Sequence, residues 1–105
     1  MTFWPNPVYR NHTGETRWYF NVALRAESTT RVHLHHYRGE WYDAAGHLQE
    51  TKEESLDIHL APQQPLSYPD LWITSALTRF RYRLIVHGRD ANGQEVSAEA
   101  VLECQ

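Results

Sequence analysis

Histidine is the residue type in this chain whose number and spacing point most directly to chemistry, since seven occur in 105 residues. Three of them, His33, His35 and His36, lie close together on a predicted strand. Strand residues two apart stand about 6.5 to 7 Å from each other. Neutral imidazoles at that spacing can share zinc or another transition metal if other strands supply further ligands. Those further ligands would have to be His47, His59 and His87. The alternatives are a polar face of exposed histidines, or one inward histidine that is hydrogen-bonded in the core.

The residues that could form a nucleophilic site do not predict an enzyme. Ser55, Asp57 and His59 contain the atoms of a triad, but neighbours on one strand face stand about 7 Å apart, whereas proton transfer needs about 3 Å. Cys104 lies next to the C-terminus, where a fraying chain end disfavours a nucleophile. The sequence contains no glycine-rich phosphate loop and no paired carboxylates that stand out from chance. We therefore expect neither catalysis nor a cofactor.

Aromatic residues without a periodic pattern to bury them are the other candidates for binding. They are Tyr19, Tyr42, Tyr68 and Trp72, with Trp4 as a further ring that has no such pattern. Rings on a sandwich face can stack on sugars or form a patch for a protein partner. The alternative is that the long loop folds back over them. We expect that burial for Trp72, because tryptophan is seldom left exposed.

Charge argues against a nucleic-acid partner. Four arginines fall on predicted outward faces, namely Arg17, Arg25, Arg81 and Arg83. Arginine next to exposed aromatic rings is a surface that can bind single-stranded nucleic acid. However, the formal net charge is −3, and Arg81 is expected to face Glu103 on the paired strand. The sequence therefore predicts a face of cross-strand salt bridges.

The clearest structural element is a β-hairpin from Phe80 to Leu102. Apolar and polar residues alternate with the period of two that is typical of a strand with one buried face. A two-residue Asn-Gly turn would place an inward residue opposite an outward one. A three-residue loop over 91–93, with Asp90 leading and Gly93 closing, pairs inward with inward residues, so that Tyr82 faces Leu102. We therefore predict the three-residue loop.

The strand from Arg31 to Tyr42 breaks the alternation. Val32 and Leu34 favour one face, while Tyr37 and Trp41 favour the other. Either a bulge near His35 and His36 returns the later aromatic residues to the first face, or both faces are covered; we favour the bulge. A second three-residue hairpin loop is predicted over 44–46, because Asp43 and Gly46 repeat the chemistry of the first loop.

The remaining elements predict an all-β fold. Residues 1–14 form an irregular lead-in with one short edge strand near Val8 and Tyr9, and a turn at 12–15. Thr16 to Ala26 is a strand, and Leu56 to Leu60 is another after a charged, exposed stretch. The proline-rich segment 61–70 is an extended crossover, and 70–76 forms either a helical turn or a short strand. We predict one domain over 1–105, an antiparallel two-sheet immunoglobulin-like sandwich of six or seven strands with no long helix.

Two short stretches resemble known sandwich families. Tyr82, near the start of the penultimate strand, resembles the tyrosine-corner region of immunoglobulin-like and fibronectin type III folds. The run from Val32 to Leu48, which contains Tyr42-Asp43-Ala44-Ala45-Gly46, is similar to the ending of small bacterial FxLYD-type modules. The resemblance covers about half of the chain and departs where histidines replace regularly spaced aliphatic residues. It implies an immunoglobulin-like sandwich, usually extracytoplasmic, without known catalysis, and it supplies no site residues.

Partner and compartment are predicted only in outline. The chain shows neither a signal peptide pattern nor a stretch that could span a bilayer, so we expect a cytoplasmic protein by default with no membrane partner; an exported mature domain would have the same pattern. The first hypothesis is a non-catalytic module that binds a protein partner or another copy of itself. The second is a ligand-binding module, for carbohydrate through Trp and Tyr or for a transition metal through the histidines.

Overall fold

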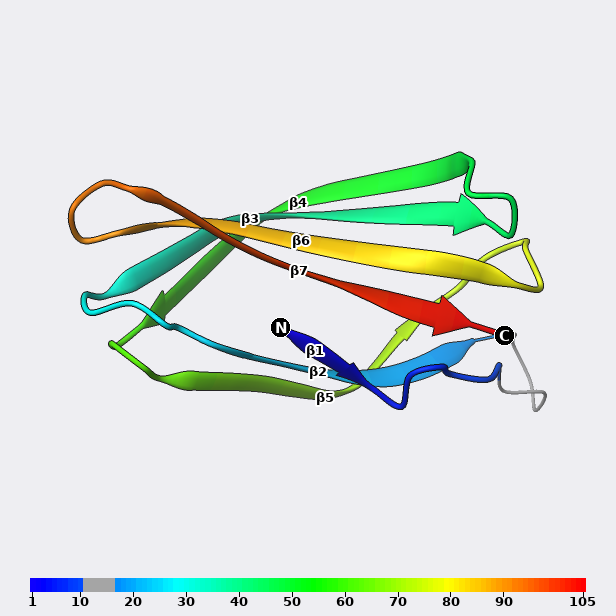
Figure 1. The fold of residues 1–105 in the computed structure, drawn as a ribbon, viewed down its shortest axis with the longest axis horizontal. Coiled ribbons are helices and arrows are strands. Elements are labelled where there is room, and N and C mark those ends of the chain that lie inside the picture. The colour runs from blue at the N-terminus through cyan, green and yellow to red at the C-terminus, as the bar shows by residue number, and fades with distance from the viewer. Residues whose placement is uncertain (11–16) are drawn as a thin grey trace.

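The computed structural model describes residues 1–10 and 17–105, which form seven β-strands and no helix. The strands make two antiparallel sheets, ordered β1-β2-β5 and β4-β3-β6-β7 (Figure 1). Their bounds are β1 Thr2–Trp4, β2 Trp18–Arg25, β3 Val32–Asp43, β4 Leu48–Leu60, β5 Pro65–Ile73, β6 Phe80–Asp90 and β7 Glu95–Cys104. No helix that could cross a membrane is present in the described part of the chain. The predicted two-sheet antiparallel sandwich is confirmed, and it is compatible with an immunoglobulin-like fold.

Both hairpin loops have the predicted length. In the β6–β7 loop the Gly93 amide donates to the Asp90 carbonyl at 3.0 Å, and Gly93 has a φ of 79°. The β3–β4 loop repeats this, with Gly46 donating to Asp43 at 3.0 Å and a φ of 87°. Glycine adopts this left-handed backbone without the steric cost that a side chain would add. Tyr82 faces Leu102 as expected, and Tyr82 and Leu84 both pack into the interior.

The predicted bulge in β3 is confirmed. The register shifts between Leu34 and His36 on both sides of β3: against β6 the extra residue is His35, whereas against β4 it is β4 that has one residue more. After it, Trp41 is buried on the same side as Val32. Gly88 of β6 lies opposite this point, and a Cβ there would stand only 2.4 Å from the His33 carbonyl oxygen. The bulge therefore requires a residue without a side chain on the adjacent strand.

Three segments differ from the prediction. The expected crossover over 61–70 becomes strand from Pro65 onward, because the chain reaches the second sheet early and pairs with β2. The short-strand alternative for 70–76 is correct as far as Ile73. Near the N-terminus the strand is β1, whereas Val8 forms a single parallel bridge to Cys104. The turn predicted at 12–15 lies outside the described residues.

The C-terminus is anchored, contrary to the expected fraying. Val8 donates its amide to the Glu103 carbonyl at 2.8 Å and accepts from the Gln105 amide at 2.9 Å. Cys104 is fully buried, together with Trp18, Phe80 and Leu102. Burial raises the pKa of its thiol to about 12, with a smaller contribution from the charge of Glu103. Cys104 is thus a protonated core residue.

Candidate functional site

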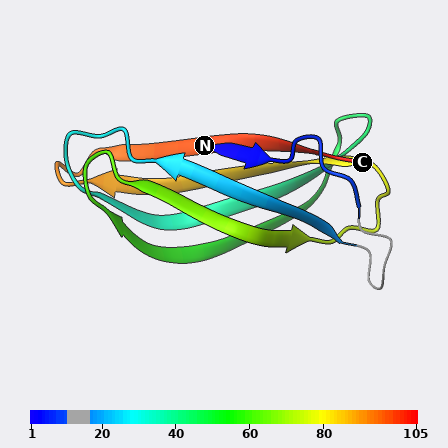
Figure 2. The ribbon, with the colours of Figure 1, turned by 90° about the horizontal axis from the view of Figure 1, so that it is seen from below.

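An apolar cleft of about 820 Å³ lies between the two sheets. On one side the segment after β1 connects to the larger sheet, where Val8 forms a bridge to Cys104 of β7. On the opposite side the edge strands are β4 and β5, and β4 extends beyond β5 when the molecule is seen from below (Figure 2). The part of β4 without a strand facing it leaves the interior accessible from that side.

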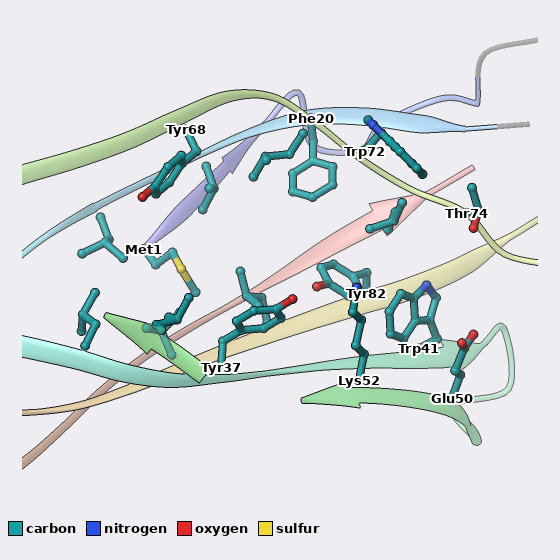
Figure 3. A pocket seen from close by; sticks show the side chains of 18 of the residues that line it. Met1, Phe20, Tyr37, Trp41, Glu50, Lys52, Tyr68, Trp72, Thr74 and Tyr82 are labelled. Atoms are coloured by element: carbon teal, nitrogen blue, oxygen red, sulfur yellow. The ribbon is translucent and has the colours of Figure 1, made fainter. Parts of the chain in front are cut away.

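The inner face of β4 changes from polar to apolar along its length. Its first half places Glu50, Lys52 and Glu54 opposite the inward residues of β3, in the order Trp41, Gly39 and Tyr37. Its second half places Leu56 and Ile58 against a buried cluster formed by Ala26, Val32, Leu34, Leu60 and Val86. In Figure 3, Trp41 and Glu50 lie at one end of the cleft with Thr74, and Tyr68 lies toward the other. The cleft therefore has one polar end and one apolar end.

Trp41 presents an unsatisfied donor at the polar end. Its side chain is 6% exposed, and its Nε1 is buried without a hydrogen-bond partner among the described residues. A buried donor left unpaired costs about 1 to 3 kcal/mol. By contrast, the Nε1 of Trp18 donates to the Gln105 carbonyl at 3.2 Å. Among the described residues, the chain therefore provides no acceptor for the indole nitrogen of Trp41.

Tyr37, which lines the cleft, forms a polar pair with Glu54 of β4. The Tyr37 hydroxyl donates to Glu54 Oε2 at 2.7 Å. Burial raises the pKa of Tyr37 to about 12, and the hydrogen bond and charge of Glu54 add to the rise. The pKa of Glu54 is lowered, first by this hydrogen bond and then by the one from Lys52. At neutral pH, Tyr37 is therefore a protonated phenol and Glu54 an ionised carboxylate.

The four predicted binding aromatics do not form one site. Tyr68 lines the cleft, and Trp72 lies at its rim (Figure 3). Trp72 is paired with Tyr19 across the β2–β5 ladder, and the Arg17 guanidinium carbon lies 4.1 Å from the centre of its ring. The expected burial of Trp72 is wrong, since it is 49% exposed: its segment is strand β5 rather than a loop that folds back. Tyr42 lies elsewhere, on the outer face of the four-stranded sheet.

That outer face is the salt-bridged surface that the sequence predicts. Glu40 is buried there and accepts from Arg38 Nε, Arg83 Nη1 and the Tyr42 hydroxyl. Burial alone would raise the pKa of Glu40, but the hydrogen bonds from Arg38 and Tyr42 outweigh it and lower the pKa. Arg81 pairs with Glu103 at 2.8 Å as expected. Of the four outward arginines, Arg17 and Arg25 belong near the other sheet, so the four do not make one basic patch.

The structure distributes the three predicted histidines over different neighbours. His33 lies directly opposite His59 in the β3–β4 register, with their rings stacked at 4.2 Å. His35 occupies the bulge, and its ring is 6.4 Å from that of His33. His36 instead lies beside His87, with ring centres 5.6 Å apart. Among the described histidines, His33 and His59 are the pair that lies within ligand distance of each other and of a carboxylate, Asp57.

Asp57 and His59 are closer than strand geometry led us to expect. Asp57 Oδ1 and His59 Nε2 are 3.1 Å apart, because the two side chains lean toward each other instead of standing perpendicular to the sheet. The distance argument against a triad is therefore wrong for this pair. Ser55 lies opposite His36 in the register. The pKa of Asp57 is lowered, first by the hydrogen bond from His33 and then by the charge of His59.

No family model matches this chain, and no curated protein matches it either. Its function is therefore argued from the chemistry of the cleft and of the two outer faces.

The sequence did not predict the cleft or the unpaired indole nitrogen of Trp41 in it. Glu50 and Lys52 fall in a stretch where both strand faces are polar, so the alternation does not say which residues point inward. The register also shifts between Trp41 and Tyr42, which moves Glu50 rather than Gln49 opposite Trp41. One signal was available: Trp41 is followed by a hairpin whose second strand offers no apolar partner for it.

Proposed function

We propose that this chain is a non-catalytic binding module whose inter-sheet cleft holds an elongated amphiphile. Its apolar body would lie along the aliphatic end of the cleft, and a hydrogen-bond acceptor on its head group would meet Trp41. The observation that carries this proposal is the buried, unpartnered Nε1 of Trp41 in the wall of the cleft. An acceptor at that position would satisfy a donor that is costly to leave unpaired.

The size and polarity of the cleft support a small molecule of this kind. Ligand pockets typically enclose about 300 to 1,000 Å³, with mostly apolar walls and a few polar groups that fix orientation. The cleft has a volume of about 820 Å³. Its polar groups gather at one end, around Trp41, Glu50 and Lys52, while Leu56 and Ile58 line the other. A ligand that is polar at one end and apolar along its length matches this gradient.

The edge strands argue against a partner that extends either sheet at the open side. Edge strands protected by charge or proline resist pairing with another chain. The free edge β4 has a charged run along its first half, from Glu50 to Glu54. The free edge β5 contains Pro65 and Pro69, with a register irregularity beside them. The space between these strands therefore suits a binding site better than their backbone edges do.

The resemblance to FxLYD-type modules is part of this proposal. The segment Tyr42-Asp43-Ala44-Ala45-Gly46 that carries it forms the closing loop of the β3–β4 hairpin. This hairpin also supplies Trp41 and the polar wall of the cleft. If the family assignment holds, the same open side should recur in other members as a binding surface for apolar molecules.

The test is a titration with defined amphiphiles. Binding of the dye anilinonaphthalene sulfonate to the protein is followed by fluorescence. The bound dye is then displaced with dodecanoate or, in a second arm, with maltohexaose. We expect displacement by dodecanoate and none by the sugar. Trp41→Phe should weaken dodecanoate binding about tenfold, the factor that a hydrogen bond of about 1.4 kcal/mol gives.

Trp4→Phe is the matched control, because Trp4 is exposed on β1 and is not part of the cleft wall. It should bind dodecanoate as the unmodified chain does. Near-ultraviolet circular dichroism confirms that each variant is folded. Equal affinity in the Trp41 variant would overturn the proposed orientation, and displacement by maltohexaose alone would make the carbohydrate hypothesis the better one.

A further inference from the structure

We propose that His33, Asp57 and His59 form a binding site for a divalent transition metal on the outer face of the β3–β4 ladder. This site is independent of the cleft and differs from the trio suggested by the sequence. Its three possible ligand atoms all lie within 4.8 Å of one another. Within the described residues this is the one group of three histidine, cysteine or carboxylate side chains that converges in this way.

The strand register brings the three side chains together. His33 and His59 are direct cross-strand partners, and Asp57 lies two residues before His59 on the same face. Their rings are stacked, with an angle of 1° between the ring planes. Asp57 Oδ1 lies 2.8 Å from His33 Nε2 and 3.1 Å from His59 Nε2. Two imidazole nitrogens and one carboxylate oxygen therefore meet at a single point.

The separations are close to those that a metal would require. Bonds of about 2.0 to 2.2 Å to nitrogen and oxygen in a tetrahedral arrangement place neighbouring ligand atoms roughly 3.4 Å apart. Asp57 Oδ1 would need to retreat by about 0.6 Å from His33 and about 0.3 Å from His59, and the ligand atoms of the two histidines lie within 4.8 Å of each other. Asp57 and His59 have room to rotate, because their side chains are 82% and 73% exposed.

The donor set indicates the class of ion. Imidazole nitrogen favours zinc, copper, nickel and cobalt, whereas calcium and magnesium prefer oxygen alone. A metal at Nε2 requires each imidazole to be neutral and to carry its proton on Nδ1, so binding to two neutral histidines moves the protons within the rings and releases none overall. Two histidines and one carboxylate leave a fourth position open, toward the solvent on this outer face. That position can accept water or a ligand from a second molecule.

The experiment uses the full chain without a histidine tag. Zn²⁺ is titrated by calorimetry, and Co²⁺ is followed by its visible absorption, which is strong for tetrahedral ligation. We expect one ion per chain, with a shift of the imidazole resonances of His33 and His59. His33→Gln, His59→Gln and Asp57→Asn should each weaken Zn²⁺ binding by about tenfold or more.

His47→Gln is the matched control, since His47 pairs with Asp43 at 3.6 Å but belongs to no group of three. It should leave the Zn²⁺ affinity unchanged, and so should Trp41→Phe, which separates this site from the cleft. Unaltered affinity in the three site variants would overturn the proposal. So would a titration in which the control loses affinity to the same extent, because that would indicate diffuse binding to surface histidines.

Discussion

The β3–β4 and β6–β7 hairpins close with the same three-residue loop and lie side by side in one sheet. On the inner face of β6–β7, Tyr82 pairs with Leu102 and Leu84 with Ala100, so apolar residues meet along the ladder. On the inner face of β3–β4, Trp41 pairs with Glu50 and Tyr37 with Glu54. Tyr82 and Leu84 of β6 also line the cleft, but β7 lies on the closed side of the sandwich, whereas the β3–β4 hairpin supplies the polar wall of the cleft.

The difference shows that hairpin geometry and core formation are separate properties. The loop sets the length and phase of the pairing through Asp and Gly, whatever the strands carry. Burial depends on whether the opposing sheet covers the inner face. The small sheet has three strands against four, so part of the larger one remains uncovered at its β4 edge.

The largest expected effect compares a leucine from each hairpin. Leu102 is fully buried, so Leu102→Ala should lower the free energy of unfolding by about 3 to 4 kcal/mol, through lost burial and a residual cavity. The same substitution at Leu56, which is half-buried at the cleft, should cost about 1 kcal/mol, because water already reaches this side chain. Urea unfolding of both variants measures this. Equal losses would contradict the assignment of a closed and an open side.

The next effect concerns the link between the two hairpins. Glu40 of β3 accepts from Arg83 of β6, and Glu40→Gln should cost about 2 kcal/mol at neutral pH, as expected for charged hydrogen bonds. The folded-state pKa of Glu40 is lowered, so its stabilisation is complete above the unfolded pKa of about 4.3 and is lost as the pH falls through the folded value.

Chemical unfolding between neutral pH and acid measures this dependence. The stability gap between the unmodified chain and Glu40→Gln should therefore narrow below about pH 4. A gap that stays constant, or widens in acid, would contradict a role for the ionised carboxylate. Glu99→Gln serves as the control for an exposed partner of Arg83, and its effect should be well below that of Glu40→Gln.

The difference between the two buried tryptophans is expected to be smaller, about 1 to 2 kcal/mol. Trp18→Phe removes a satisfied hydrogen bond to Gln105 from the centre of the core and should cost about 2 to 3 kcal/mol. Trp41→Phe removes an unpaired donor, so relief of that penalty offsets part of the lost volume, and the cost should be about 1 kcal/mol. Thermal unfolding of the ligand-free variants tests this order, and the reverse order would show that Trp41 is satisfied in solution.

The smallest effect is spectroscopic and sharpens the description of the cleft wall. Tyr37 should stay protonated up to about pH 12, and Tyr37→Phe should remove that late step from the absorbance titration. Glu54→Gln should lower the pKa of Tyr37 while leaving it above the ordinary value of about 10, since burial is the larger cause. A full return to the ordinary value would show that Tyr37 is solvated and that the cleft is wider than described.

The sequence by itself determined both hairpins, the bulge at His35 and the sandwich class. In those stretches apolar and polar residues alternate, and only one register keeps the apolar ones together. It also predicted the pairing of Arg81 with Glu103, which follows from the Gly93 loop alone.

The tertiary structure decided the cleft and the grouping of the histidines. Where β4 is polar on both faces, the alternation does not show which side chains point inward. A one-residue register shift beside Trp41 also changes which residue of β4 lies opposite this tryptophan. His33 and His59 are 26 residues apart in the sequence. They meet only because β4 runs back along the whole length of β3. Contacts of that range depend on the register of complete strands, which no local pattern in this chain encodes.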